Sequence, residues 1–120
     1  MNKEIIRKLL EIQKKLDLEN NGFPKNSCSL ASKVVYDELG FLPYSGFVLV
    51  NNQVVKHSWN ETSENEIIDL SLYQFNNQYP KIIYSSRKSI EGKWKYFFNK
   101  KNTSSLRKYI KNFDESFFKI

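Results

Sequence analysis

The spacing of the apolar residues changes near Gly46, and this change limits the folds that the chain can adopt. Before it, apolar residues recur at steps of three and four, as on one face of an α-helix. After it, they alternate with polar residues, as in β-strands. Helical segments followed by strand segments are typical of an α+β domain. We therefore expect residues 1–120 to form one compact α+β domain, with N-terminal helices packed on an antiparallel sheet.

Two helices are predicted in the first third of the chain. The apolar spacing predicts an amphipathic helix over residues 2–18. Ser27 is a suitable N-cap for a second helix that runs to Leu39, with Gly40 as the residue that ends it. This prediction places Cys28 in the first turn of the second helix. The unpaired N–H groups and the positive dipole end at that position favour a thiolate.

A β-hairpin is predicted after the two helices. Residues 47–50 and 53–59 alternate between apolar and polar, and Asn51 and Asn52 between them suit a two-residue turn. Polar residues then predict another turn, followed by a third strand over residues 66–70 that is antiparallel to the second.

The alternation also predicts which side chains share a face. His57 and Trp59 lie on one face of the second predicted strand, and Lys56 and Ser58 lie on the other. Asp69 ends the third predicted strand. If the turn between the strands is tight, Asp69 lies near His57, across the pair or one strand over.

The pattern after residue 80 is weaker. Residues 81–84 predict a fourth strand, and residues 94–98 are apolar enough for either a strand or a helical turn. A last helix is predicted from Ser104 to about Phe113, with Thr103 or Ser104 as its N-cap.

Cys28 and His57 are the only cysteine and the only histidine of the chain, and Asp69 follows them. A thiol attacks a carbonyl carbon as its thiolate, so it needs a base that accepts the proton. His57 can be that base, and Asp69 can hold the other ring nitrogen in the productive tautomer. The oxyanion would be met by the backbone N–H of Cys28 or Ser29, with Asn26 as a candidate side-chain donor.

Each of these residues alone also has a purely structural interpretation. A single cysteine in a helix is usually a small apolar core residue, and a single histidine on a strand is more often a hydrogen-bonded residue than a base. Asp69 alone could be a strand-end charge. The catalytic interpretation rests on their joint occurrence in the order that one mechanism requires. Trp59 shares the strand face of His57, so we expect it to pack beside the site and to shield the cysteine and histidine from water.

A metal site explains these residues less well. One cysteine, one histidine and one aspartate leave no further soft ligand and show no paired ligand spacing. We therefore expect neither a metal nor a cofactor.

Cysteine content and hydropathy indicate a cytoplasmic protein. A single cysteine cannot form an internal disulfide, which fits a reducing compartment. No segment approaches 18 uninterrupted apolar residues, so no membrane span is expected. Residues 1–8 carry charges through their apolar stretch and lack a small-residue cleavage site, which argues against a secretory signal.

The net charge of +6 is unevenly distributed. Residues 1–80 hold 8 basic and 10 acidic side chains, whereas residues 81–120 hold 11 basic and 3 acidic ones. This basic third could bind an acidic partner. It also contains many aromatic residues, but their spacing is typical of a core, so nucleic-acid binding is the less favoured function.

The residues around the three candidates resemble a known enzyme group. A cysteine at a helix start, a histidine followed by a small residue and tryptophan, and an aspartate before Leu-Ser are similar to the transglutaminase-like branch of the papain-like superfamily. That branch includes transglutaminases, arylamine N-acetyltransferases, peptide N-glycanases and bacterial peptidases that mature lasso peptides. The resemblance covers about residues 26–75, and its specific parts are residues 57–61 and 67–75.

The resemblance implies a papain-like fold in which Cys28 is the nucleophile, His57 the base and Asp69 the orienting group. It implies a cysteine-dependent hydrolase or acyl-transferase with a peptide, protein, acyl or amide substrate, and it leaves peptidase, amidase, deamidase and transferase activities open. Residues 20–27 lack the glutamine that papain-like proteases place before the nucleophile. The alternative is a non-catalytic module that binds nucleic acid or an acidic protein through residues 81–120.

Overall fold

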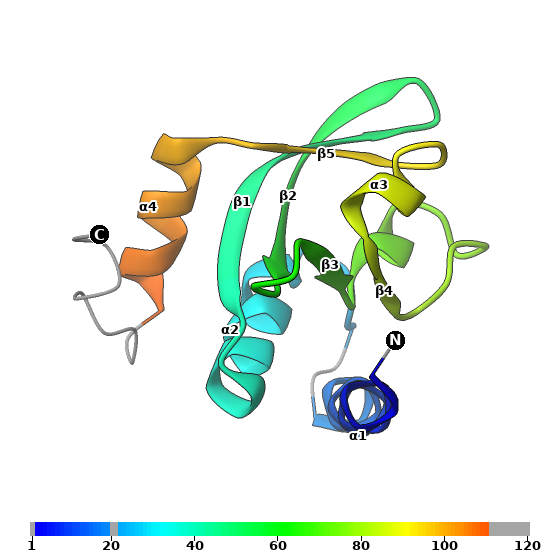
Figure 1. The fold of residues 1–120 in the computed structure, drawn as a ribbon, viewed down its shortest axis with the longest axis vertical. Coiled ribbons are helices and arrows are strands. Elements are labelled where there is room, and N and C mark those ends of the chain that lie inside the picture. Colours follow the sequence, from blue (N-terminus) through cyan, green and yellow to red (C-terminus); the bar gives the residue numbers. More distant parts are fainter. Residues whose placement is uncertain (1, 20–21, 111–120) are drawn as a thin grey trace.

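The computed structural model describes residues 2–19 and 22–110 of the chain (Figure 1). Within these ranges, no helix combines the length and the apolar character needed to cross a membrane. The elements follow in the order α1 (Lys3–Glu19), α2 (Cys28–Leu39), β1 (Leu42–Val50), β2 (Gln53–Glu61), β3 (Glu66–Asp69), the 3-10 helix η1 (Leu72–Gln74), β4 (Ile83–Ser86), α3 (Arg87–Ile90), β5 (Lys95–Phe98) and α4 (Lys100–Tyr109).

The five strands form one sheet with the order β4-β3-β2-β1-β5, and every pairing is antiparallel. The α+β class, with two N-terminal helices followed by an antiparallel sheet, is therefore confirmed. The last strand in sequence, β5, does not continue from β4 but crosses to the opposite edge and pairs with β1. This crossover brings the C-terminal part of the chain beside the hairpin (Figure 1).

The predicted hairpin is present, and its strands are longer than predicted. Asn51 and Asn52 both have positive φ angles, 48° and 62°, as a two-residue hairpin turn requires. The register that follows places Ser45 opposite Ser58 and Gly46 opposite His57. The turn thus determines which β1 residues lie next to the histidine.

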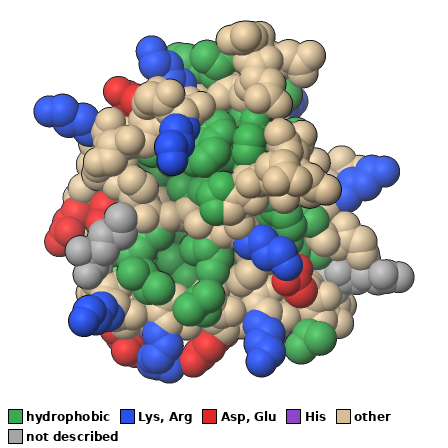
Figure 2. All heavy atoms as spheres, turned by 90° about the vertical axis from the view of Figure 1, so that its right-hand side faces the viewer, with side chains coloured by type: hydrophobic (Ala, Val, Ile, Leu, Met, Phe, Trp, Pro, Cys, Tyr) green, Lys and Arg blue, Asp and Glu red, His purple; other side chains and the backbone are tan. Residues whose placement is uncertain are grey.

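Both faces of the sheet are covered by apolar side chains. On one face, residues of α1 and α2 pack with Ile68 and Leu70. On the other face, Trp59, Ile67 and Tyr96 pack with residues of η1 and α3. Apolar side chains also gather on the outer surface that carries α3 (Figure 2). Because both faces are covered, polar groups at the centre of the sheet are shielded from water.

Gly46 allows β5 to lie close to β1. A Cβ atom at this position would be 2.0 Å from the carbonyl oxygen of Phe97 and 2.8 Å from the backbone nitrogen of Asn99. Residues 94–98, for which the sequence allowed a strand or a helical turn, therefore provide a strand, with Phe98 opposite Gly46. The same approach lets Tyr96 enter the core.

The predicted start of the last helix is wrong. The helix begins at Lys100, because Asn99 is its N-cap and accepts a 2.9 Å hydrogen bond from the backbone N–H of Asn102. Thr103, which we expected to be a cap, instead bonds to both backbone polar groups of Ser45, each at 2.9 Å. The helix ends at Tyr109, and the predicted residues 111–113 lie outside the described part of the chain.

Replacing Gly46 should test the close approach of β5. We expect Gly46→Ala to lower the free energy of unfolding by about 3 kcal/mol, because the new methyl group collides with backbone that cannot move aside. Urea unfolding followed by circular dichroism measures this change. Gly92→Ala is the matched control, since a Cβ at Gly92 meets no atom within 4 Å. An equal effect of both substitutions would contradict the packing described here.

Candidate active site

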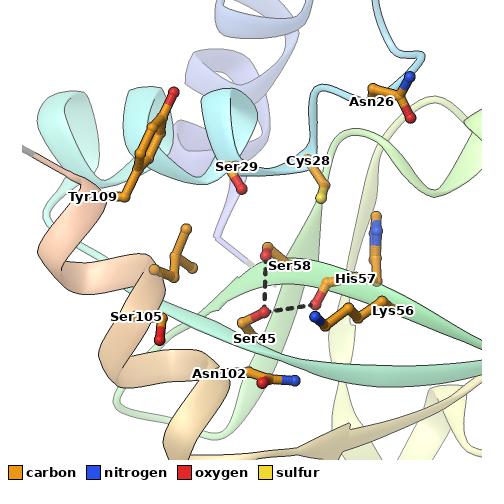
Figure 3. A pocket seen from close by; sticks show the side chains of 11 residues that line it. Asn26, Cys28, Ser29, Ser45, Lys56, His57, Ser58, Asn102, Ser105 and Tyr109 are labelled. Atoms are coloured by element: carbon orange, nitrogen blue, oxygen red, sulfur yellow. Dashed lines mark hydrogen bonds between the residues drawn. The ribbon is translucent and has the colours of Figure 1, made fainter.

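A pocket of about 500 Å³ lies between α2, α4 and the β1-β2 hairpin (Figure 3). Cys28 and Ser29 line it from α2, and His57 and Ser58 line it from β2. The inner side of α4 forms the opposite wall. The cysteine and the histidine predicted from sequence thus share one cavity.

His57 and Asp69 meet because β3 is shorter than β2. The two strands pair only at Asn60 with Ile68 and at Glu61 with Ile67, so His57 lies beyond the last paired residue. Continuing the register places Asp69 diagonally across from His57 on the same face. His57 Nε2 and Asp69 Oδ2 are 2.7 Å apart. The predicted proximity of the two residues is therefore confirmed.

Asp69 is held by three further hydrogen bonds. Its Oδ1 accepts from the Ser71 backbone N–H at 2.9 Å and from the Ser71 hydroxyl at 3.4 Å. Its Oδ2 accepts from the Tyr96 hydroxyl at 2.7 Å. Burial raises the pKa of Asp69, but the His57 charge and these donors outweigh it and lower the pKa overall. Asp69 is therefore a buried carboxylate.

His57 is only 2% exposed, and no histidine side chain is visible on the face shown in Figure 2. Phe75 packs edge-on against its ring, with centroids 5.3 Å apart. Burial lowers the pKa of His57, but the Asp69 carboxylate, together with Cys28, raises it to about 9. The imidazole is therefore protonated at neutral pH.

Nδ1 of His57 is the ring nitrogen that remains for the thiol, since Nε2 bonds to Asp69. It is buried and makes no hydrogen bond of normal geometry with a described residue. The sulfur of Cys28 lies beside the ring (Figure 3), and the two groups interact electrostatically.

Cys28 is the first residue of α2, as the sequence predicts. Ser27 occupies the N-cap position, but its hydroxyl donates to the Lys25 carbonyl oxygen and does not cap the helix. Burial raises the pKa of Cys28, whereas His57 and hydrogen bonding by Ser58 lower it, and the net shift is downward. The Ser27 side chain leaves the first-turn N–H groups of α2 uncapped, and Cys28 lies at this positive end of the helix.

The other predicted site residues lie in different places. Asn26 and Ser29 line the pocket with Cys28 (Figure 3). Trp59 does not line it: the indole packs edge-on against Tyr96 with centroids 5.1 Å apart, and its N–H donates to Glu61. Phe75 is the aromatic ring that packs against His57, whereas Trp59 lies two residues further along β2.

Sequence reasoning missed Tyr96, which lies 27 residues from Asp69 in the chain and reaches it only through the crossover of β5. It also missed Gln74, whose Oε1 accepts a 3.1 Å hydrogen bond from the Asn26 backbone N–H. The Nε2 group of Gln74 is buried and has no partner among the described residues. Gln74 therefore anchors the loop before Cys28 and retains an unused donor. No local pattern identifies either residue.

Ser58 and Ser45 extend the polar network behind Cys28. Their hydroxyl oxygens are 3.1 Å apart, and Ser45 donates a 3.1 Å hydrogen bond to the His57 carbonyl oxygen (Figure 3). Because Thr103 of α4 bonds to the Ser45 backbone, this network also joins the pocket wall to the sheet.

No family model, curated protein or solved structure matches the chain. Within residues 2–19 and 22–110, no group of three or more His, Cys, Asp or Glu side chains could hold a metal ion. The resemblance to transglutaminase-like enzymes therefore rests on residues 26–75, and the roles of Cys28, His57 and Asp69 are treated below as proposals.

The dependence of His57 on Asp69 can be measured directly, since His57 gives the only imidazole signals of the chain. In a Cys28→Ser background, which removes the thiolate, we expect the additional change Asp69→Asn to lower the pKa of His57 from well above 6.5 to below it. In that protein, burial still lowers the pKa of the His57 ring, and no carboxylate at position 69 raises it. An NMR titration of the imidazole measures the shift.

Asp37→Asn in the same background is the control for this titration. Asp37 lies on α2 and pairs with Lys33 at the surface, so its loss should leave the pKa of His57 unchanged. An unchanged pKa in the Asp69→Asn protein would contradict the electrostatic account of the site.

Proposed function

We propose that the protein is a papain-like cysteine enzyme, a hydrolase or acyl-transferase that works through a thioester at Cys28. The observation that carries this proposal is the buried 2.7 Å contact between His57 and Asp69 beside a cysteine at a helix start. A structural histidine does not need a fully buried carboxylate, which is costly to maintain. In a cysteine enzyme, such a carboxylate stabilises the imidazolium that keeps the thiol ionised.

In the first step, the Cys28 thiolate attacks the carbonyl carbon of an amide or acyl substrate. The forming oxyanion lies near the first N–H groups of α2, which can stabilise it. Side-chain donors are available nearby from Asn26, at the pocket rim, and from the unused amide of Gln74. The C–N or C–O bond then breaks, and the proton held by His57 passes to the leaving group.

In the second step, water or an amine attacks the thioester. Neutral His57 accepts a proton from this nucleophile, the C–S bond breaks, and the thiolate returns beside an imidazolium. Attack by water completes peptidase, amidase or deamidase chemistry, and attack by an amine completes transfer. Asp69 stabilises the imidazolium and holds the ring orientation in both steps.

The basic third of the chain supports a second candidate, a binding module for nucleic acid or an acidic protein. α4 contains Lys100, Lys101, Arg107 and Lys108 and no acidic residue. Phe97 and Phe98 on β5 are 47% and 50% exposed. Tight binding with a steep salt dependence and an inert thiol would favour this module over the enzyme.

Acylation of Cys28 by p-nitrophenyl acetate tests the enzyme directly. We expect a burst of nitrophenol and a mass increase of one acetyl group, which peptide mapping places on Cys28. Added amine should accelerate release of the acetyl group if transfer is the preferred second step. His57→Gln should slow acylation about a hundredfold or more, because the thiol then lacks its base and counter-charge.

Cys28→Ala controls for acetylation of lysines, and it should show neither the burst nor rapid mass increase. Equal acylation rates for the unmodified protein and His57→Gln would show that the pair does not activate the thiol. That result would count against the proposed function.

A further inference from the structure

The pocket holds a cation close to the proposed nucleophile. Lys56 lies two residues before Ser58 on β2, so both side chains project from the same face of the sheet. Both line the pocket together with Cys28. Figure 3 shows the Lys56 amine directed toward Ser45 and Asn102, across the pocket floor from the cysteine.

The charge of the pocket is one-sided. Among the described lining residues, Lys56 and the buried His57 are the only basic groups and none is aspartate or glutamate, and the proposed Cys28 thiolate offsets the charge of the His57 imidazolium but not that of Lys56. The remaining lining is mostly hydroxyl and amide groups, including Asn102, Ser105 and Tyr109 of α4. Such a lining attracts a substrate that carries negative charge and hydrogen-bond acceptors.

We propose that this pocket takes an acyl or amide substrate with a carboxylate a few atoms from the scissile carbonyl, and that Lys56 selects that carboxylate. The inference rests on the proposed function and names its substrate class. With the carbonyl carbon at the Cys28 sulfur, the carboxylate accepts hydrogen bonds from the Lys56 amine and from Asn102.

The strand geometry sets the spacing between the positions of Ser58 and Lys56 on β2. Positions two apart on a strand are separated by about 6.6 Å along the chain. The long Lys56 side chain can therefore bring its amine to a carboxylate that lies a few atoms from the carbonyl held at Cys28. A single lysine also matches one carboxylate better than a phosphate dianion, which would retain an uncompensated charge.

A pair of thiol-alkylating reagents that differ only in charge tests this selection. The α-amides of N-chloroacetyl-glutamate and N-chloroacetyl-glutamine, of which only the first carries a carboxylate, deliver the same reactive carbon to Cys28, whose attack forms a C–S bond and releases chloride. We expect the unmodified protein to react about three- to fivefold faster with the glutamate reagent, and we expect added salt to reduce this ratio.

Variants at Lys56 test whether this residue causes the faster reaction with the glutamate reagent. Lys56→Gln should bring the ratio of the two rates close to one, and Lys56→Arg should retain part of the preference. Lys88→Gln, on α3, is the matched control and should leave the ratio unchanged. In each of the four proteins, the rate with the neutral glutamine reagent is the reference for the ratio, which separates charge selection from thiol activation.

Two results would overturn the role of Lys56 in selection while leaving the proposed function intact. One is a ratio near one in the unmodified protein despite rapid alkylation by the neutral reagent. The other is a preference that survives Lys56→Gln, which would assign selection to the cations of α4. Faster reaction with a phosphonate analogue than with the glutamate reagent would overturn the choice of a carboxylate. A cysteine inert to every reagent would instead refute the proposed function itself.

Discussion

The buried Asp69 carboxylate is the group on which the site depends. A carboxylate shielded from water is stable only if a positive charge lies beside it and its oxygens accept hydrogen bonds. Removing one partner of a buried ion pair costs about 3–5 kcal/mol. Here His57 supplies the charge, and Ser71 and Tyr96 supply the other donors. The same requirement keeps His57 protonated, and a protonated imidazole favours a thiolate at Cys28. The stability of this buried centre and the proposed activation of the thiol therefore depend on the same ion pair.

The crossover of β5 connects this centre to the pocket wall. Gly46 lets β5 approach β1, and this approach delivers the Tyr96 hydroxyl to Asp69. The chain then turns at Asn99 into α4, which Thr103 joins to the backbone of β1. The segment that completes the support of the carboxylate thus also closes one side of the pocket that contains Cys28. A change in this segment is expected to affect both stability and the proposed substrate selection.

Local patterns in the sequence predict the elements near the site well. Helix spacing and Gly40 predict α2, and the paired asparagines predict the hairpin that carries His57. Local patterns do not predict a residue's role where tertiary contacts determine it. Asn99 rather than Thr103 caps α4, because Thr103 bonds to Ser45 on the distant strand β1. Tyr96 could not be assigned from sequence for the same reason, since its partner depends on a sheet order that no local spacing encodes.

The ionisation state of Cys28 is the most direct test of this account. Because the chain has one cysteine, the ultraviolet absorbance of the thiolate during a pH titration reports on this residue alone. The account predicts a midpoint below the ordinary value of about 8.5, and a return toward that value in His57→Gln. A midpoint at or above the ordinary value, unchanged by His57→Gln, would contradict the claim that the buried pair activates the thiol.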